Sequence, residues 1–150
     1  MSEPDPSELW DKVLEWLLVA DSDHRAARAC LAADPPLPGV AAYHCQQAIE
    51  KLLKGFLVRS NKDFGKTHDL DELGQSVLAI YPSAARFVTP ARGWSAWNVV
   101  YRYPGETGPV PEPAAEELTR ALDLIANLAQ MLRTLEPPSD KAPTTMETDP

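Results

Sequence analysis

Apolar residues recur at helical spacing along most of the chain. From Leu9 to Cys30 they return every three or four residues with acidic residues between them, which predicts a helix over about 8–32. Ser7 stands where its hydroxyl would cap the first turn. After a proline-rich break ending at Gly39, the strongest pattern predicts a helix over about 39–60. Its expected buried stripe is Ala41, Cys45, Ala48, Ile49, Leu52, Leu53 and Phe56.

Three further helical segments follow. Asp69 and Glu72 have capping spacing and predict a helix over about 69–81. Thr89-Pro90 predicts the start of a fourth helix that ends near Tyr103, and a fifth is expected over about 113–135. No stretch alternates like a strand, so we predict an all-α, antiparallel bundle of four to five helices.

The domain boundaries follow from the same pattern. We expect one helical domain over residues 7–136, between a disordered, proline- and acid-rich segment 1–6 and a disordered polar tail 137–150. Apolar types make up 44% and charged types 24% of the 150 residues, which is ordinary for a globular domain. The net charge of −8 argues against nonspecific coating of nucleic acid, because that binding needs surplus cations.

Cysteine usage and hydropathy bear on the compartment. Cys30 and Cys45 form no CxxC pair and are too few for a disulfide framework, so a reducing, cytoplasmic setting is expected. No run of 18 apolar residues occurs and the N-terminus has no basic flank, so we expect neither a membrane span nor a secretory signal. No metal site and no cofactor is predicted.

Positive charge is concentrated in one segment. Residues 40–68 hold five lysines and arginines against two acidic residues, a charge of +3, which leaves −11 for the rest of the chain. His44, Gln47, Lys51 and Lys54 step by three, four and three, so a helix places them on one face. Lys66 and His68 follow in the next loop. This pattern suits docking of one anion, but a plain solvated helix face has the same composition.

Three stretches in order, Tyr43–Lys54, Lys66–Leu70 and Tyr101–Pro104, carry a resemblance to a known family. The first contains QQAxEKxxK, the second THDL and the third RYP, and together the chain resembles the HEPN domain family over about residues 7–135. The resemblance implies a helical bundle that usually forms a homodimer and associates with nucleotides or RNA. It also implies a minimal nucleotidyltransferase as partner, in a toxin–antitoxin or defence module.

Many members of that family are metal-independent ribonucleases whose motif is an arginine followed, after four to six residues, by a histidine. The chain has three histidines, His24, His44 and His68, and none has an arginine at the required upstream positions. No histidine follows Arg102. The resemblance is therefore to a member without this motif, and we predict no catalytic residue.

What remains is a predicted nucleotide- or phosphate-binding site. Arg102 could bind a phosphate with two hydrogen bonds, and Tyr103 or Tyr101 could stack on a base. The predicted site residues are His44, Gln47, Lys51, Lys54, Lys66, His68, Arg102 and Tyr103.

Each of these residues also has a purely structural interpretation. Arg102 could pair with an acid such as Asp69, and His68 could be a hydrogen-bonded residue at a helix start. Trp94 and Trp97 are expected in the core or a dimer interface, and His24 has no partner that the sequence identifies.

Three classes of function stay open at this point. The first, which we favour, is a non-catalytic homodimer that binds a nucleotide or an RNA end and works with a nucleotidyltransferase. The second is a ribonuclease with a rearranged site, such as His44 or His68 with Arg102. The third is a module for dimerisation and partner docking alone.

Overall fold

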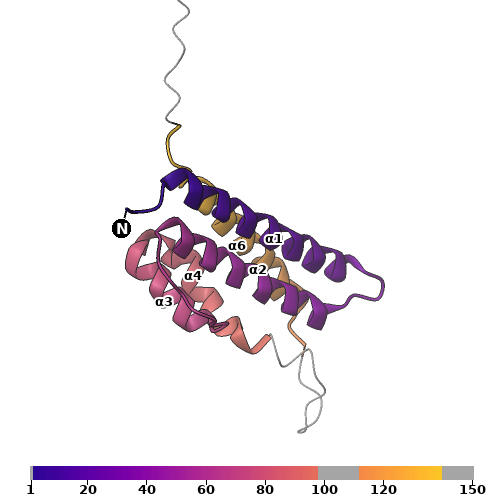
Figure 1. Ribbon diagram of the computed structural model, residues 1–150. Coiled ribbons are helices and arrows are strands. Elements are labelled where there is room, and N and C mark those ends of the chain that lie inside the picture. The colour runs from indigo at the N-terminus through magenta and orange to yellow at the C-terminus, as the bar shows by residue number, and fades with distance from the viewer. Residues whose placement is uncertain (1, 98–111, 140–150) are drawn as a thin grey trace, which may run out of the picture.

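The computed structural model describes residues 2–97 and 112–139, and its regular elements are all helical (Figure 1). Within these residues there is no strand, so the prediction of an all-α chain is confirmed. The α-helices are α1 (Pro6–Ala32), α2 (Pro38–Arg59), α3 (Leu70–Ile80), α4 (Ala85–Ala91) and α6 (Ala115–Arg133). Two short 3₁₀ segments, η1 (Pro82–Ala84) and η2 (Arg92–Ala96), flank α4.

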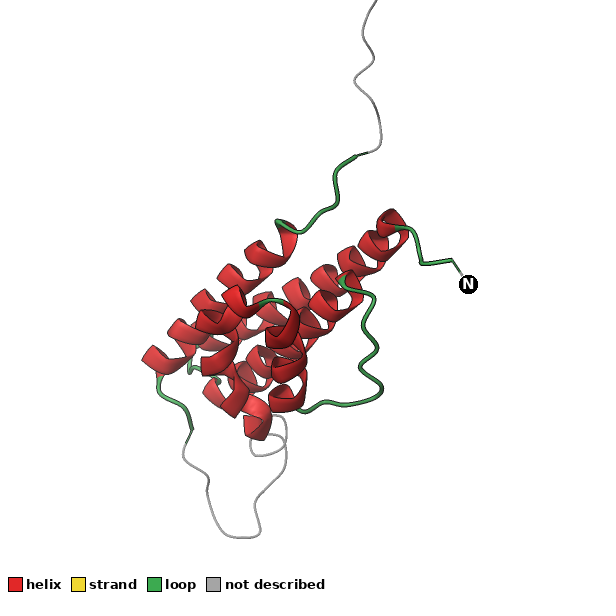
Figure 2. Cartoon of the chain, turned by 90° about the vertical axis from the view of Figure 1, so that its left-hand side faces the viewer, coloured by secondary structure: helices red, strands yellow, loops and turns green. Residues whose placement is uncertain are grey.

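The long helices α1, α2 and α6 lie side by side, and the shorter α3 and α4 pack below them (Figures 1 and 2). α1 and α2 run in opposite directions across a short turn. His24 on α1 contacts Leu122 on α6, and Arg59 at the end of α2 contacts Leu135 just after α6. α6 therefore runs antiparallel to α1 and parallel to α2.

α2 is the central helix of the bundle, because α1, α3 and α6 all pack against it. The predicted stripe of α2 is confirmed, since every one of its residues is at most 1% exposed. Gly55 allows α2 to pack closely against α6, because a Cβ atom built there would lie 2.8 Å from Leu132 Cδ2. Burial of α2 on several sides brings polar residues into the core along with the apolar ones: Gln46, Glu50 and Lys54 are buried as well.

Local hydrogen bonds fix the start of α1 and the end of α2. Asp5 caps α1 by accepting from the Ser7 backbone N–H at 2.9 Å, so the expectation that Ser7 is the cap was wrong. Pro6 explains the shift, because proline is favoured at the first helical position. α2 ends at a left-handed Asn61 with φ of 52°. The Lys62 N–H reaches the Leu57 carbonyl there, as in a Schellman motif.

The predicted start of the fourth helix was also wrong. Thr89 and Pro90 lie inside α4, which begins at Ala85 directly after η1. Val88 and Ala91 form its buried side, and Ala84 at the end of η1 is buried four residues before Val88, so the three follow helical spacing. Pro90 has no N–H to donate to the carbonyl four residues earlier, which interrupts the α-helical hydrogen bonding, and the chain continues as 3₁₀ helix from Arg92. The predicted continuation to Tyr103 lies outside the described residues, as does the tail from 140 onward.

Candidate functional site

Two buried carboxylates organise the polar side of α2. Asp23 comes from α1 and Glu50 from α2 itself, and both side chains are largely shielded from solvent. Each carboxylate binds one histidine and one lysine. The positive side chains predicted from the sequence are thus held by acidic partners, and the cluster carries no net charge while its imidazoles are neutral.

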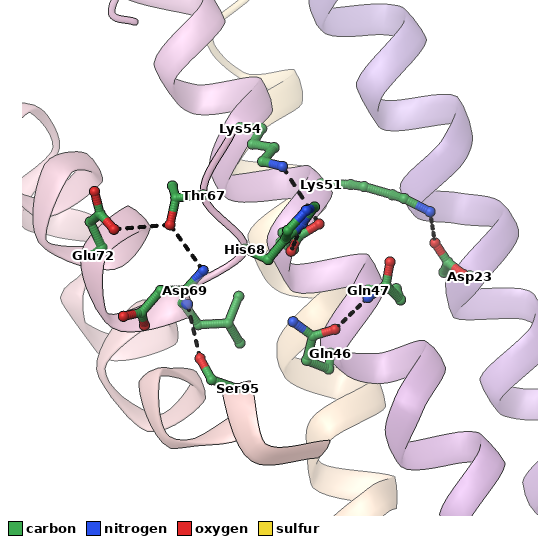
Figure 3. Close-up of polar contacts among 12 residues, drawn as sticks. Asp23, Gln46, Gln47, Lys51, Lys54, Thr67, His68, Asp69, Glu72 and Ser95 are labelled. Atoms are coloured by element: carbon green, nitrogen blue, oxygen red, sulfur yellow. Dashed lines mark hydrogen bonds and ion pairs between the residues drawn. The ribbon is translucent and has the colours of Figure 1, made fainter. Parts of the chain in front are cut away.

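Asp23 holds His44 and Lys51 at the same time. His44 Nδ1 donates to Asp23 Oδ1 at 2.9 Å, and Lys51 Nζ donates to Asp23 Oδ2. His44 and Lys51 are seven residues apart, about two helical turns, so both side chains lie on the side of α2 that faces α1. Figure 3 shows Lys51 reaching across to Asp23. Because an ionised carboxylate only accepts hydrogen bonds, the bonded His44 proton is on Nδ1, and Nε2 makes no hydrogen bond among the described residues.

Glu50 holds Lys54 and His68 in the same way. His68 Nδ1 donates to Glu50 Oε1 at 2.9 Å, and Lys54 Nζ lies 3.6 Å from Glu50 Oε2. The Lys54 side chain is only 8% exposed, and its ammonium lies 5.9 Å from the Trp16 ring centroid and 5.5 Å from that of Phe64. These distances are within the range of cation–π contacts. Lys54 is therefore enclosed, whereas His68 remains 68% exposed.

The loop that carries His68 is fastened at the start of α3. The Asp69 carboxylate accepts from the Asp71 N–H at 2.9 Å and caps the helix as predicted. Thr67 Oγ1 accepts from the Asp69 N–H at 3.2 Å and donates to Glu72 at 2.9 Å, so Thr67 links the two residues of the expected capping pair (Figure 3). Ser95 Oγ accepts from the Leu70 N–H at 2.9 Å. These contacts position His68 over Glu50.

Gln47 and its neighbour complete the polar side of α2. Gln47 Nε2 donates to Gln46 Oε1 at 2.6 Å. Gln46 is fully buried, and its own Nε2 has no hydrogen-bond partner in the described part of the chain. Lys66 is exposed in the loop before His68. The structure thus brings His44, Lys51, Lys54 and His68 onto the two carboxylates, with Gln47 between them on α2.

Arg102, Tyr103 and Tyr101 lie outside the described residues, so their position relative to this cluster stays a prediction. Of the tryptophans singled out earlier, Trp97 is 8% exposed and packs in the core. Its ring stacks on Trp94 with 4.9 Å between centroids. Trp97 therefore lies in the core, as one of the two predicted alternatives required, and Trp94 is partly buried against that core.

Sequence reasoning missed Asp23 as a site residue. One signal was present: Asp23 stands between Ala20 and Ala27 on the buried side of α1, where a charged residue needs a partner. His24 also has a partner that the sequence did not reveal, because its Nε2 lies 3.0 Å from the Leu122 carbonyl oxygen.

A separate groove lies between α1 and α6. Its volume is about 220 Å³, and its floor includes Leu17, Leu52 and Ile125. Asp21, His24, Arg28 and Arg133 contribute polar groups to its walls, and none of the predicted site residues lines it.

Burial also determines the chemistry of the cysteine in α2. Cys45 is fully buried, and the loss of solvent raises the pKa of its thiol from 9.0 to about 12. At neutral pH this thiol is protonated and not nucleophilic. Within residues 2–97 and 112–139, no group of three or more His, Cys, Asp or Glu residues is arranged to hold a metal ion.

The geometry defines an all-α helical bundle in which Lys51, Lys54 and His44 of the central helix, with His68 of the following loop, are held by two buried carboxylates. The HEPN domain model matches residues 13–135 of this chain, and the chain belongs to that family. Neither the curated proteins nor the solved structures yielded a match. None of the helices in the described ranges combines the length and apolar character required to cross a membrane.

Proposed function

We propose that this HEPN-domain protein is a non-catalytic homodimer that binds the phosphate of a nucleotide or an RNA end beside α2. The observation that carries the proposal is the double arrangement of one carboxylate, one lysine and one histidine. Each histidine is held by its Nδ1, so its Nε2 is left to contact a ligand. Side chains fixed in this way lose little further freedom when a ligand binds, which favours affinity.

Lys51 and the two histidines are the described residues best placed to contact a phosphate. Lys51 has a quarter of its side chain exposed, and the imidazoles of His44 and His68 are also accessible. Lys54 is enclosed by aromatic rings and supports Glu50 rather than reaching the ligand. Asp23 and Glu50 neutralise the charges of Lys51 and Lys54. In the proposal, Arg102 supplies the additional positive charge that binds the phosphate, and Tyr103 stacks on the base.

Calorimetric titration with ATP, GTP and a short 5′-phosphorylated RNA tests this site. With a ligand that the wild type binds, Lys51→Ala and Arg102→Ala should each weaken affinity at least tenfold, because a charge-assisted hydrogen bond contributes about 1.5–3 kcal/mol. Lys62→Ala is the matched control, since Lys62 is an exposed loop lysine outside the site. Unchanged affinity in both variants, with native circular dichroism, would refute the site.

The partner assignment is tested separately. A minimal nucleotidyltransferase should be encoded beside the gene for this chain and should co-elute with it when the two are co-expressed. A genomic neighbourhood without such a gene contradicts this part of the proposal and leaves the ligand site untouched.

One observation favours a second candidate, a metal-independent ribonuclease. A carboxylate that holds an imidazole by Nδ1 also orients Nε2 for proton transfer, and both His44 and His68 have such a carboxylate. Metal-free incubation with RNA compares the wild type with the double variant His44→Ala, His68→Ala. Activity lost in the double variant favours the ribonuclease, whereas equal residual cleavage identifies a contaminant.

A further inference from the structure

The outward side of α1 is the most unusual exposed helix face in the described chain. Leu18 is 71% exposed and Leu14 is 47% exposed, one turn apart on the same side of the helix. By contrast, the outward side of α6 carries Glu117, Arg120 and Asp123. Exposed leucines on neighbouring turns cost free energy in water, and such a face is typical of a contact surface.

The exposed residues of this face continue along the whole of α1. Leu14 and Leu18 belong to a stripe whose members are separated by four, three, four, four, three and four residues, and all are exposed. These steps stay close to the roughly 3.6 residues of a helical turn, so the stripe keeps to one side of the helix from end to end. The α1 stripe consists of Ser7, Asp11, Leu14, Leu18, Ser22, Arg25 and Ala29.

Charge along the α1 stripe is polarised about Leu18. Asp11 lies seven residues before Leu18 and Arg25 seven residues after it. Neither has an ion-pair partner among residues 2–97 and 112–139. Two copies of α1 packed antiparallel about Leu18 would bring Asp11 of each copy against Arg25 of the other. A parallel pair would instead oppose like charges at both positions, which is unfavourable.

We propose that the α1 stripe is the homodimer interface, with two copies of α1 antiparallel about a two-fold axis at Leu18. The inference rests on the homodimer of the proposed function and assigns its surface. Leu18 packs on Leu18 of the second copy, and Leu14 packs beside Ser22, whose small side chain leaves room for it. Two symmetric Asp11–Arg25 ion pairs fix the direction and register, as expected for an isologous contact. α1 has 27 residues and is about 40 Å long, so the contact can extend well beyond the leucines.

Sedimentation velocity over a range of concentrations tests the interface. Leu18→Asp should weaken dimerisation at least tenfold, because it removes the central contact and places two carboxylates together. Ile80→Asp, at an exposed apolar residue on α3, is the matched control and should leave the dimer unchanged. Leu18 is mostly exposed, so circular dichroism of its variant should remain native.

Charge exchange tests the antiparallel register. Asp11→Arg and Arg25→Asp should each weaken the dimer at least tenfold when alone, and mixing the two variants should restore a dimer with two ion pairs, one of them reversed. The double variant Asp11→Arg, Arg25→Asp should dimerise like the wild type. A double variant that stays dissociated overturns the antiparallel arrangement.

The outcomes separate this inference from the proposed function. A wild-type chain that is monomeric throughout contradicts both the homodimer and its interface. A dimer unaffected by Leu18→Asp and by the charge reversals overturns the α1 stripe but not the homodimer. The nucleotide titration with Lys51→Ala reports on the ligand site in either case.

Discussion

Removal of the Glu50 charge should destabilise the protein strongly, because Lys54 would be left without its acidic partner. The two side chains are 5% and 8% exposed, so solvent cannot replace the lost interaction. Removing one member of a buried ion pair typically costs about 3–5 kcal/mol. Glu50→Gln keeps the shape of the side chain, and we expect a loss at the lower end, about 3 kcal/mol, since the Lys54–Glu50 distance is 3.6 Å. For a domain of this size, that loss lowers Tm by about 6–12 °C.

A double-mutant cycle by urea denaturation measures the coupling between the two charges. Lys54→Met keeps an apolar side chain beside the Trp16 and Phe64 rings, so the double variant Glu50→Gln, Lys54→Met should lose much less stability than Glu50→Gln alone. We expect the double variant to recover about 2 kcal/mol. Glu15→Gln, on the exposed side of α1, serves as the control and should stay within about 0.5 kcal/mol of the wild type. A loss below about 1 kcal/mol for Glu50→Gln, or a cycle without coupling, would refute the buried ion pair.

Two further predictions concern the core around α2. Gly55→Ala should lower the free energy of unfolding by about 1–3 kcal/mol in urea denaturation, because the new Cβ would lie 2.8 Å from Leu132 Cδ2. Gly93→Ala is the control and should be tolerated, because a Cβ atom built at Gly93 has no neighbour within 4 Å. Equal stability of the two variants would contradict the close approach of α2 and α6. Cys45, with its pKa raised to about 12, should resist alkylation at pH 8 while the partly exposed Cys30 reacts, as read by mass spectrometry. The folded state holds the Cys45 thiol proton more tightly than the unfolded state, so the contribution of Cys45 to stability should decline as pH rises from about 9 toward 12. Alkylation of Cys45 in the native protein at pH 8 would contradict its burial.

The sequence predicted the helices correctly where the buried residues recur at regular helical spacing. The stripe from Ala41 to Phe56 repeats at helical spacing and is fully buried, so periodicity alone identified it. Thr89-Pro90 misled the prediction because it is a strong local signal for a helix start. Packing of Val88 and Ala91 determines that helix instead, and this packing depends on residues distant in the sequence.

The candidate site was predictable only in part, for a related reason. Helical spacing placed His44, Lys51 and Lys54 on one side of α2, but it could not reveal their partners. Asp23 is 21 residues from His44 and 28 from Lys51, so its role depends on the packing of α1 against α2. Lys54 is buried with its ammonium beside two aromatic rings, and one of these rings comes from a loop whose position the sequence pattern does not determine.

α1 would serve both proposals through two different faces. Leu18 and Asp23 are five residues apart, which turns the helix by about 140° and places one side chain outward and the other against α2. A substitution at Leu18 therefore leaves the hydrogen bonds from Asp23 to His44 and Lys51 in place. If Leu18→Asp dissociates the dimer and nucleotide affinity is retained, each copy binds its ligand independently. If affinity falls with dissociation while the Asp23 cluster is intact, the second copy must complete the ligand site.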